Sequence, residues 1–84
     1  MDAEQEMPKA LSYGEKAVGL TFNPGGIPAV NSIKTAYAAI IDALNEFRNG
    51  TEDGEVKRLC SVAITEAQGA QMWAVKAATW ELNN

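Results

Sequence analysis

The residues best suited to binding chemistry surround a glycine-rich loop at residues 19–28, directly before a long helical pattern. Pro24 and the glycine pair after it are typical of a turn, because glycine accepts positive φ and the residue before proline avoids the helical region. Lys34 follows near the start of the helix. There its ammonium, with the free N–H groups of the helix N-terminus, can bind an anion gathered by the loop. An ordinary solvated lysine is the alternative, and on residue type alone it is the commoner one.

Phe22 is an aromatic residue of the same loop. Its ring can stack on a nucleobase, because every base presents a π-face. Alternatively, it anchors the loop by packing against the helices. The loop is not a Walker phosphate-binding loop, since no Gly-Lys-Ser/Thr follows its glycines. The residues by themselves leave both interpretations of Phe22 open.

A second polar group interrupts the apolar pattern in the middle of the last helical run. It consists of Thr65, Glu66, Gln68 and Gln71. These side chains either line a pocket between subunits or form a satisfied polar network that fixes helix register. Helical nucleotide pyrophosphohydrolases bind magnesium with several acidic residues at helical spacing, but Glu66 has no acidic residue three or four positions away. We therefore expect no metal, no other cofactor and no catalysis.

Composition excludes several other classes of protein. The 84 residues carry a net charge of −4, which gives no basic footprint for a DNA or RNA polymer. A single cysteine, Cys60, and the absence of histidine exclude a disulfide framework, the usual zinc sites and every His-based triad. No signal-peptide pattern and no apolar run of about 20 residues is present, so we expect a soluble, cytoplasmic protein without a membrane partner.

The periodicity predicts one all-α domain over residues 1–84. We expect a frayed segment at 1–7 and a short helix at 8–18, which Tyr13 and Gly14 interrupt and Gly19 ends. Longer helices are expected at 29–49 and 54–81. The link between them is short, so they should form an antiparallel hairpin.

Both long helices carry more apolar surface than a single hairpin can cover. On the first, the predicted seam consists of Val30, Ile33, Tyr37, Ile40, Leu44 and Phe47, widened by Ala38 and Ile41. On the second, the predicted seam consists of Val56, Leu59, Ala63, Glu66, Ala70, Trp73, Ala77 and Trp80. Beside it runs a row of mostly small residues: Cys60, Ile64, Ala67, Gln71, Ala74 and Ala78. We therefore expect a compact homo-oligomer, with Trp73 and Trp80 as core or interface anchors.

Two stretches carry a family resemblance. The first is VGLTFNPGGIPAVNSIK at 18–34, continuing as AAIIDALNEFR at 38–48, and the second is AITEAQGAQMWAVKA at 63–77. Together they resemble the helical hairpin domain shared by the phage anti-CBASS cyclic-nucleotide sponge (anti-CBASS protein two) and Thoeris anti-defence protein one. The absence of the β-rich domain of the Thoeris inhibitor makes the chain look like the all-helical anti-CBASS type.

The resemblance implies a phage protein that acts in the cytoplasm of the infected bacterium. Such proteins sequester cyclic oligonucleotide messengers, including cyclic dinucleotides such as cGAMP, without cleaving them, so that CBASS effectors stay inactive. They assemble as hexamers and bind dinucleotides between protomers, through an aromatic residue before the hairpin and a lysine early in its first helix. Lys34 matches that lysine, and Phe22 is the nearest candidate for the aromatic residue, in a loop of different length. Thr21 and Asn23 are candidates for polar contacts to the same ligand.

The family's second site, for cyclic trinucleotides, uses an Arg-Thr pair on the last helix. Here the pair reads Ile64-Thr65, which removes a bidentate phosphate donor. Thr65 remains a candidate contact and Gln68 a candidate replacement. The resemblance therefore implies that dinucleotides bind better than trinucleotides.

Two functions of other classes stay open beside this one. The first is an oligomeric helical scaffold or regulator that binds proteins and no nucleotide. The second, which we rank last, is an acidic-site nucleotide hydrolase that depends on Glu66.

Overall fold

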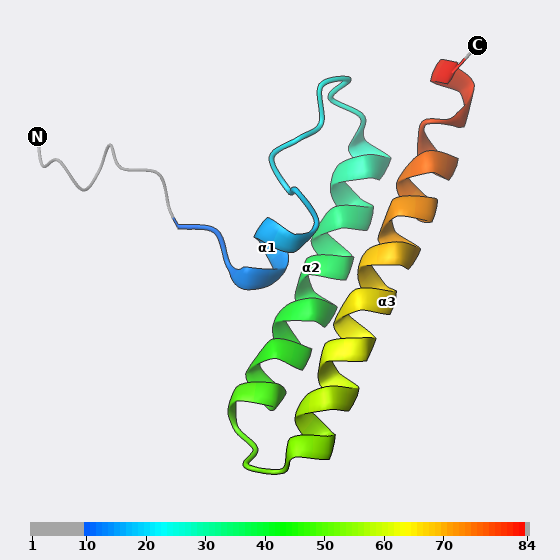
Figure 1. Cartoon of the computed structure of the whole chain (residues 1–84). Helices are drawn as coiled ribbons and strands as arrows, with labels where there is room; N and C mark the ends of the chain where they lie inside the picture. The colour runs from blue at the N-terminus through cyan, green and yellow to red at the C-terminus, as the bar shows by residue number, and fades with distance from the viewer. Residues whose placement is uncertain (1–9, 84) are drawn as a thin grey trace, which may run out of the picture.

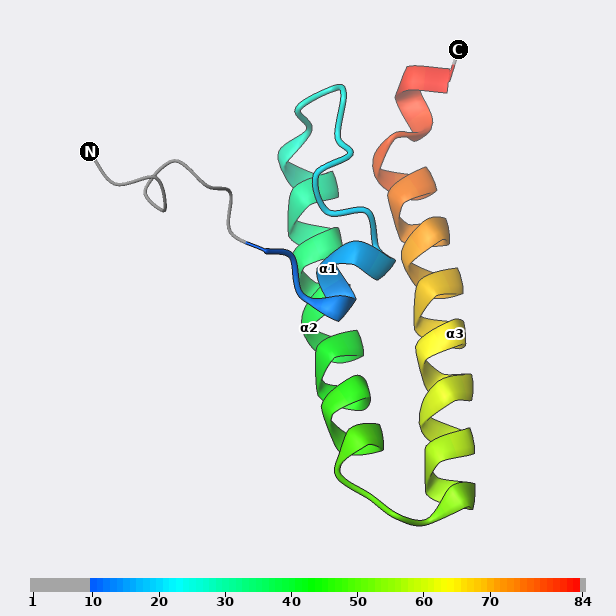
Figure 2. The same ribbon diagram turned by 60° about the vertical axis from the view of Figure 1, so that its left-hand side comes forward.

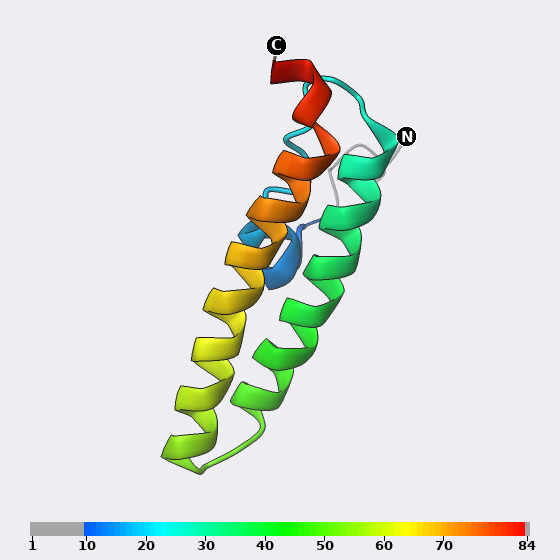
Figure 3. The same cartoon turned by 90° about the vertical axis from the view of Figure 1, so that its right-hand side faces the viewer.

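A computed structural model describes residues 10–83, excluding the side chain of residue 83. Its helices are α1 (Tyr13–Ala17), α2 (Pro28–Asn49) and α3 (Gly54–Ala78), followed by the 3-10 turn η2 (Trp80–Asn83). No strand occurs in this part of the chain, which confirms the all-α class. Helices α2 and α3 lie side by side and antiparallel, and α1 packs across α2 (Figures 1 and 2). Figure 3 shows the hairpin of the two long helices after a turn of 90°. The loop before α2 lies at the same end of this hairpin as the C-terminal end of α3.

Helix α1 is shorter than the helix predicted at 8–18. Residues 10–12 are not helical, and residues 1–9, with the segment expected to fray, lie outside the described residues. The helix begins at Tyr13 because Ser12 is extended and closes a capping box: its hydroxyl accepts from the Glu15 amide, and the Glu15 carboxylate accepts from the Ser12 amide. Tyr13 and Gly14 therefore start the helix and do not interrupt it. Gly19 ends it as predicted, with φ at 64°.

Asp42 of α2 holds the start of α1. Its carboxylate accepts a hydrogen bond from the Ser12 hydroxyl at 2.7 Å and another from the Gly14 amide at 2.6 Å. The amides at a helix start have no partner within the helix, so a carboxylate placed there accepts a hydrogen bond from one of them. Its negative charge also interacts favourably with the positive end of the helix dipole. Gly14 itself is buried against α2. These contacts fix the segment that leads into the loop at 19–27.

The ends of the long helices follow local capping rules. Pro28 occupies the first position of α2, one residue earlier than predicted, and Asp53 caps α3 by accepting from the amides of Glu55 and Val56. Gly50 ends α2 with φ at −93°, so the expected left-handed conformation is absent there. Helix α3 ends at residue 78 and not at 81, because the Thr79 hydroxyl donates to the Val75 carbonyl at 2.9 Å and the chain tightens into η2.

The buried face of α2 matches the predicted stripe in part. Its buried residues are Val30, Lys34, Ala38 and Ile41, and all of them except Lys34 belong to that stripe. Ile40 and Phe47, which the prediction placed in the seam, are exposed in the single chain. The reason is that α2 has two neighbours: Gly14 of α1 packs against the main-chain carbonyl of Ala38, and Ile41 shares the core cluster with Ile64 of α3. The core consequently centres on Val18, Ala38, Ile41 and Ile64.

On α3 the small row faces α2, and the predicted seam faces outward. The buried residues Cys60, Ile64 and Gln71 all belong to the small row. Leu59, Trp73 and Trp80 of the predicted seam are exposed. Small residues allow two helix backbones to lie close, which explains why this row packs against α2. The single chain thus leaves a large apolar surface on α3 uncovered. Over the described residues, no helix is both long and apolar enough to span a membrane.

Candidate ligand-binding site

The loop between α1 and α2 is closed by its own hydrogen bonds. The Phe22 amide donates to the Gly19 carbonyl at 2.9 Å, and the Gly26 amide donates to the Asn23 carbonyl at 2.9 Å. The Asn23 side chain donates to the Ile27 carbonyl at 3.0 Å and accepts from the Ile27 amide at 3.2 Å. Gly26 supplies the positive φ, at 61°, that the turn requires. Asn23 therefore uses both ends of its amide to shape the loop.

Lys34 lies beneath this loop. Its Nζ donates to the Gly19 carbonyl at 2.9 Å and to the Phe22 carbonyl at 2.6 Å, and it lies 5.6 Å from the centroid of the Phe22 ring. Only 5% of the residue is exposed. Lys34 is therefore not the ordinary solvated lysine considered as the alternative above. Its ammonium is already hydrogen-bonded within the protein. The sequence placed Lys34 near the loop, but it gave no sign that the side chain would be buried in it.

Among residues 10–83, no carboxylate forms an ion pair with Lys34. The ion pair that the structure gives in this range joins Arg58 and Glu55 at 2.6 Å. Within the described residues, the Lys34 ammonium is therefore stabilised by two neutral carbonyls and one aromatic face, and no carboxylate there compensates its charge. A buried charge in that state favours the arrival of an anion, because desolvation has removed the water that would otherwise screen it.

Phe22 and Thr21 form the outer surface of the loop. Phe22 is 71% exposed, so it does not pack against the helices of the single chain as a loop anchor. Thr21 is also exposed, and Asn23 is half-buried. The structure thus brings together three features of the predicted site: an exposed aromatic ring, an exposed hydroxyl and a buried cation. Asn23 belongs to the same loop, but its amide already has partners there.

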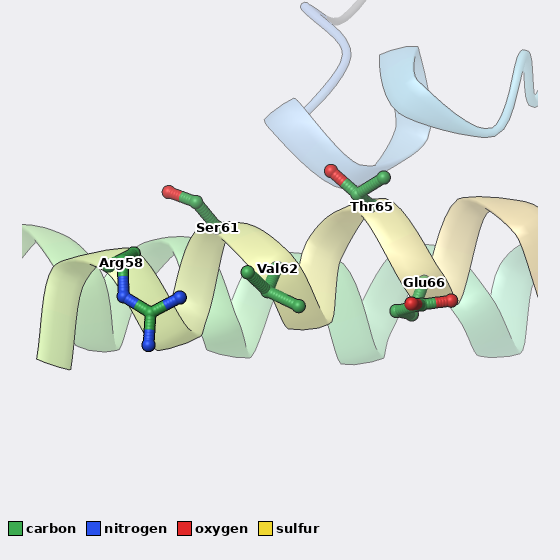
Figure 4. Close-up of a pocket in the computed structure, with 5 residues that line it drawn as sticks. All are labelled: Arg58, Ser61, Val62, Thr65 and Glu66. Atoms are coloured by element: carbon green, nitrogen blue, oxygen red, sulfur yellow. The ribbon is translucent and has the colours of Figure 1, made fainter. Parts of the chain in front are cut away.

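The candidates for a second site separate in space. Thr65 lines a shallow depression on α3 together with Arg58, Ser61, Val62 and Glu66 (Figure 4). Gln68 is not part of that lining, and its side-chain amide lies 3.5 Å from the Ala17 carbonyl as a weak hydrogen bond. Ile64, which stands where the resemblance expects arginine, is 3% exposed and belongs to the core.

Arg58 and Ser61 are members of this depression that sequence reasoning missed. They lie seven and four positions before Thr65, a spacing that places all three on one side of a helix. That spacing was the available signal. Arg58 bonds Glu55 through two contacts, at 3.0 and 2.6 Å, and this hydrogen bonding holds the pKa of Glu55 below its usual value. Ser61 accepts from Arg48 of α2 at 2.8 Å.

The polar cluster predicted on α3 does not form a single network. Thr65 and Glu66 are exposed, whereas Gln71 is 5% exposed and faces the interior. No buried polar side-chain atom of the described residues lacks a partner. Within residues 10–83, no three acidic, cysteine or histidine side chains gather closely enough to hold a metal ion.

A third feature lies near the end of α3. Trp73, Lys76, Ala77 and Trp80 line an apolar depression, and the Lys76 ammonium lies 5.9 Å from the centroid of the Trp73 ring. Trp73 is 73% exposed. Trp80 is exposed as well, so neither tryptophan is a core anchor within the single chain.

The comparisons with known proteins agree with this fold. The sequence profile of the Acb2/Tad1 hairpin domain matches residues 15–79, which include α2, α3 and the loop that holds Lys34 and Phe22. No curated protein and no solved structure gives a significant match. The matched family comprises sponge-type anti-defence proteins and is not a known enzyme family. Since the match covers most of the chain, the chain belongs to the Acb2/Tad1 hairpin domain family.

Proposed function

We propose that this protein captures cyclic oligonucleotide second messengers, foremost cyclic dinucleotides such as cGAMP, and holds them without cleavage. By lowering the concentration of free messenger, it would keep CBASS effectors inactive in the cytoplasm of a bacterium infected by the phage that encodes it. The observation that carries the proposal is the buried Lys34 ammonium beneath the exposed Phe22 ring, in a chain of the Acb2/Tad1 family.

Each part of the loop meets one part of such a ligand. A cyclic dinucleotide has two bases with π-faces and two phosphates with negative charge. The Phe22 ring stacks on a base, an interaction that tolerates different bases. The charge of Lys34 attracts a phosphate. Two of the three N–H groups of its ammonium donate to loop carbonyls, so one N–H remains for a direct contact. The Thr21 hydroxyl adds a hydrogen bond, and Asn23 contributes chiefly by keeping the turn closed.

A second subunit completes the pocket in this proposal. One exposed loop covers only one side of a ligand, whereas small-molecule sites bury most of their ligand. The exposed apolar residues Leu59 and Trp73 of α3 and Trp80 of η2 supply surface for assembly. Burying such residues in an interface is favourable, because it removes apolar surface from water. We propose a homohexamer with dinucleotide sites between subunits.

Cyclic trinucleotides have weaker support. Thr65 is exposed in its depression, but Gln68 lies outside that depression and Ile64 is buried. No arginine therefore stands beside Thr65 in sequence to bind a phosphate through two hydrogen bonds. We expect dinucleotides to be the preferred class.

A scaffold that binds other proteins is the second candidate function. The apolar depression of Trp73, Ala77 and Trp80 favours it, because exposed tryptophans are typical anchors of protein interfaces. This function requires neither Lys34 nor Phe22. Substitutions in the loop therefore separate the two functions.

The test is calorimetric titration of the purified protein with cGAMP, followed by chromatography of the ligand recovered after denaturation. Binding with recovery of intact ligand supports sequestration. If a panel of cyclic di- and trinucleotides produces no heat and no retention, the scaffold function takes its place. Recovery of linearised ligand would instead reveal an enzyme and contradict the proposal.

A further inference from the structure

We infer that Lys34 is the positioning residue of this loop: its buried ammonium holds the Gly19 and Phe22 carbonyls and thereby sets the exposed Phe22 ring before any ligand arrives. The inference deepens the proposed function, on which its consequence for ligand binding rests. Its structural half concerns the ligand-free protein alone. The two halves can therefore fail separately.

The hydrogen bonds of Lys34 reach both ends of one turn. The Gly19 carbonyl accepts from the Phe22 amide and from the Lys34 ammonium, at 2.9 Å in each case. The Phe22 carbonyl accepts from the same ammonium at 2.6 Å. One cation thus joins the first and last residues of the turn, across 15 and 12 positions of sequence. Hydrogen bonds from a charged donor are stronger than those between neutral groups, so this cation is the main tie between the loop and α2.

Phe22 is attached to Lys34 in two ways. Its carbonyl is bonded to the ammonium, and its ring centroid lies 5.6 Å from the same nitrogen. A cation over an aromatic face is attracted by the ring quadrupole, which favours one orientation of the ring. The ring itself is largely exposed, and from the described part of the chain it has no other polar contact that would fix its direction. Lys34 therefore determines where the stacking surface points.

Because Lys34 is buried and hydrogen-bonded, its role differs from that of a mobile surface cation that pairs with a ligand. With 5% of the residue exposed and two N–H groups bonded, the ammonium cannot move toward a ligand without releasing a loop carbonyl. A solvated lysine would make its first contact with the ligand, whereas this lysine makes its contacts within the protein. Fixing a loop in its binding conformation raises affinity, because less conformational freedom is lost on binding.

The first experiment compares amide hydrogen exchange of residues 19–27 in ligand-free wild-type protein, Lys34→Met and Lys16→Met. Lys16→Met is the matched control, since it removes the same charge from an exposed position on α1. We expect exchange of the Phe22 amide to rise by about tenfold or more in Lys34→Met, as loss of a hydrogen bond to a charged group implies. The control should leave it unchanged. Exchange in Lys34→Met within about twofold of the wild type would overturn the inference.

Rescue separates positioning from a general effect on folding. The Lys34→Cys variant in a Cys60→Ala background is alkylated while unfolded and then refolded. Aminoethylation restores an ammonium on a side chain of lysine length, whereas S-propylation restores the length without the charge. We expect only the aminoethylated protein to recover slow exchange at the Phe22 amide. Equal recovery with both groups, or with neither, would contradict positioning by the ammonium.

The ligand-binding half is tested by a double-mutant cycle with cGAMP on Phe22→Ala, Lys34→Met and the double variant. If Lys34 positions the Phe22 ring, the double variant loses less affinity than the sum of the two single losses, because part of the Lys34→Met loss is the loss of the positioned ring. Fully additive losses would show that Lys34 acts on the ligand only by its own phosphate contact, and would overturn this half of the inference. If cGAMP does not bind the wild type at all, the proposed function fails, while the exchange and rescue experiments still decide the structural half.

Discussion

A Cβ atom on Gly14 would overlap the main-chain carbonyl of Ala38, so α1 can pack on α2 in this arrangement only with glycine at position 14. The same Cβ would come within 2.9 Å of Asp42 Oδ1, which is the acceptor for the Gly14 amide. Gly14 therefore allows the close approach and also supplies the hydrogen bond. Since α1 leads directly into the loop that holds Phe22, this contact fixes one end of the candidate site.

Gly14→Ala should destabilise the protein by about 1–3 kcal/mol, because the added methyl group forces α1 away from α2. The helix-forming preference of alanine opposes this effect by about 1 kcal/mol. Gly54→Ala is the control, since a Cβ there meets nothing within 4 Å. Urea denaturation followed by circular dichroism measures both variants. Equal stability of Gly14→Ala and the wild type would show that α1 does not pack as described.

Asp42→Ala should cost about 1–3 kcal/mol of stability, because the Gly14 amide loses its partner in a buried position. Ser12→Ala should cost about 0.5–2 kcal/mol, since it removes both the hydroxyl bond to Asp42 and the N-cap of α1 while the Gly14 bond remains. Glu46→Ala, one turn further along α2 and exposed, is the control. Thermal unfolding of the three variants gives the order. An Asp42→Ala variant no less stable than Glu46→Ala would contradict the assigned role of Asp42.

Phe22→Ala should weaken cyclic dinucleotide binding by about 5- to 150-fold, the range expected for loss of one base-stacking contact. Stability should hardly change, because the ring is exposed in the single chain. Phe47→Ala removes another exposed phenylalanine, at the opposite end of α2, and should preserve affinity. Calorimetric titration with cGAMP measures the three proteins. Similar affinities for Phe22→Ala and the wild type would move the stacking site away from this loop.

The helices and the loop could be predicted from sequence, because capping and turn residues act locally. Proline at the start of α2 and Asp53 before α3 mark ends that the structure confirms within one residue. Which row of an amphipathic helix is buried depends on the neighbours that pack against it. Two adjacent apolar rows on α3 look alike by periodicity, and only packing against α2 selects the row of Ile64.

The environment of Lys34 could not be predicted for a related reason. Burial of a lysine depends on acceptors, and here they are carbonyls of the preceding loop, at Gly19 and Phe22. The direction of a backbone carbonyl in a loop cannot be deduced from residue types. The predictions at Lys34 and Phe22 nevertheless located two side chains that the structure brings together. Ser61 and Arg58 were not predicted as site residues, because what makes them candidates is the depression that they line together with Thr65.

Trp73→Glu should reduce the size of the assembled protein. We expect wild-type protein to elute as a multiple of the 9.0 kDa chain, and the variant as a smaller species, because a charge placed in an apolar interface is costly. Folding of the single chain should survive, since Trp73 is exposed in it. Met72→Glu makes a comparable exchange outside the predicted seam and serves as control. Light scattering after size exclusion measures the mass of each protein. An unchanged mass for Trp73→Glu would exclude the face of Trp73 from the interface.

Cyclic dinucleotides should bind more tightly than cyclic trinucleotides by about 10- to 150-fold, the effect of lacking one charged hydrogen-bond donor. Restoring arginine at position 64 would not test this, because Ile64 is buried in the core and the variant would lose stability. Titration of wild-type protein with both ligand classes is the direct measurement, and Thr65→Ala should leave dinucleotide affinity unchanged. Trinucleotide binding of equal or greater strength would contradict the prediction. In that event Arg58→Ala becomes the deciding variant, since Arg58 is the arginine that shares the depression of Thr65 and could release Glu55 to bind phosphate.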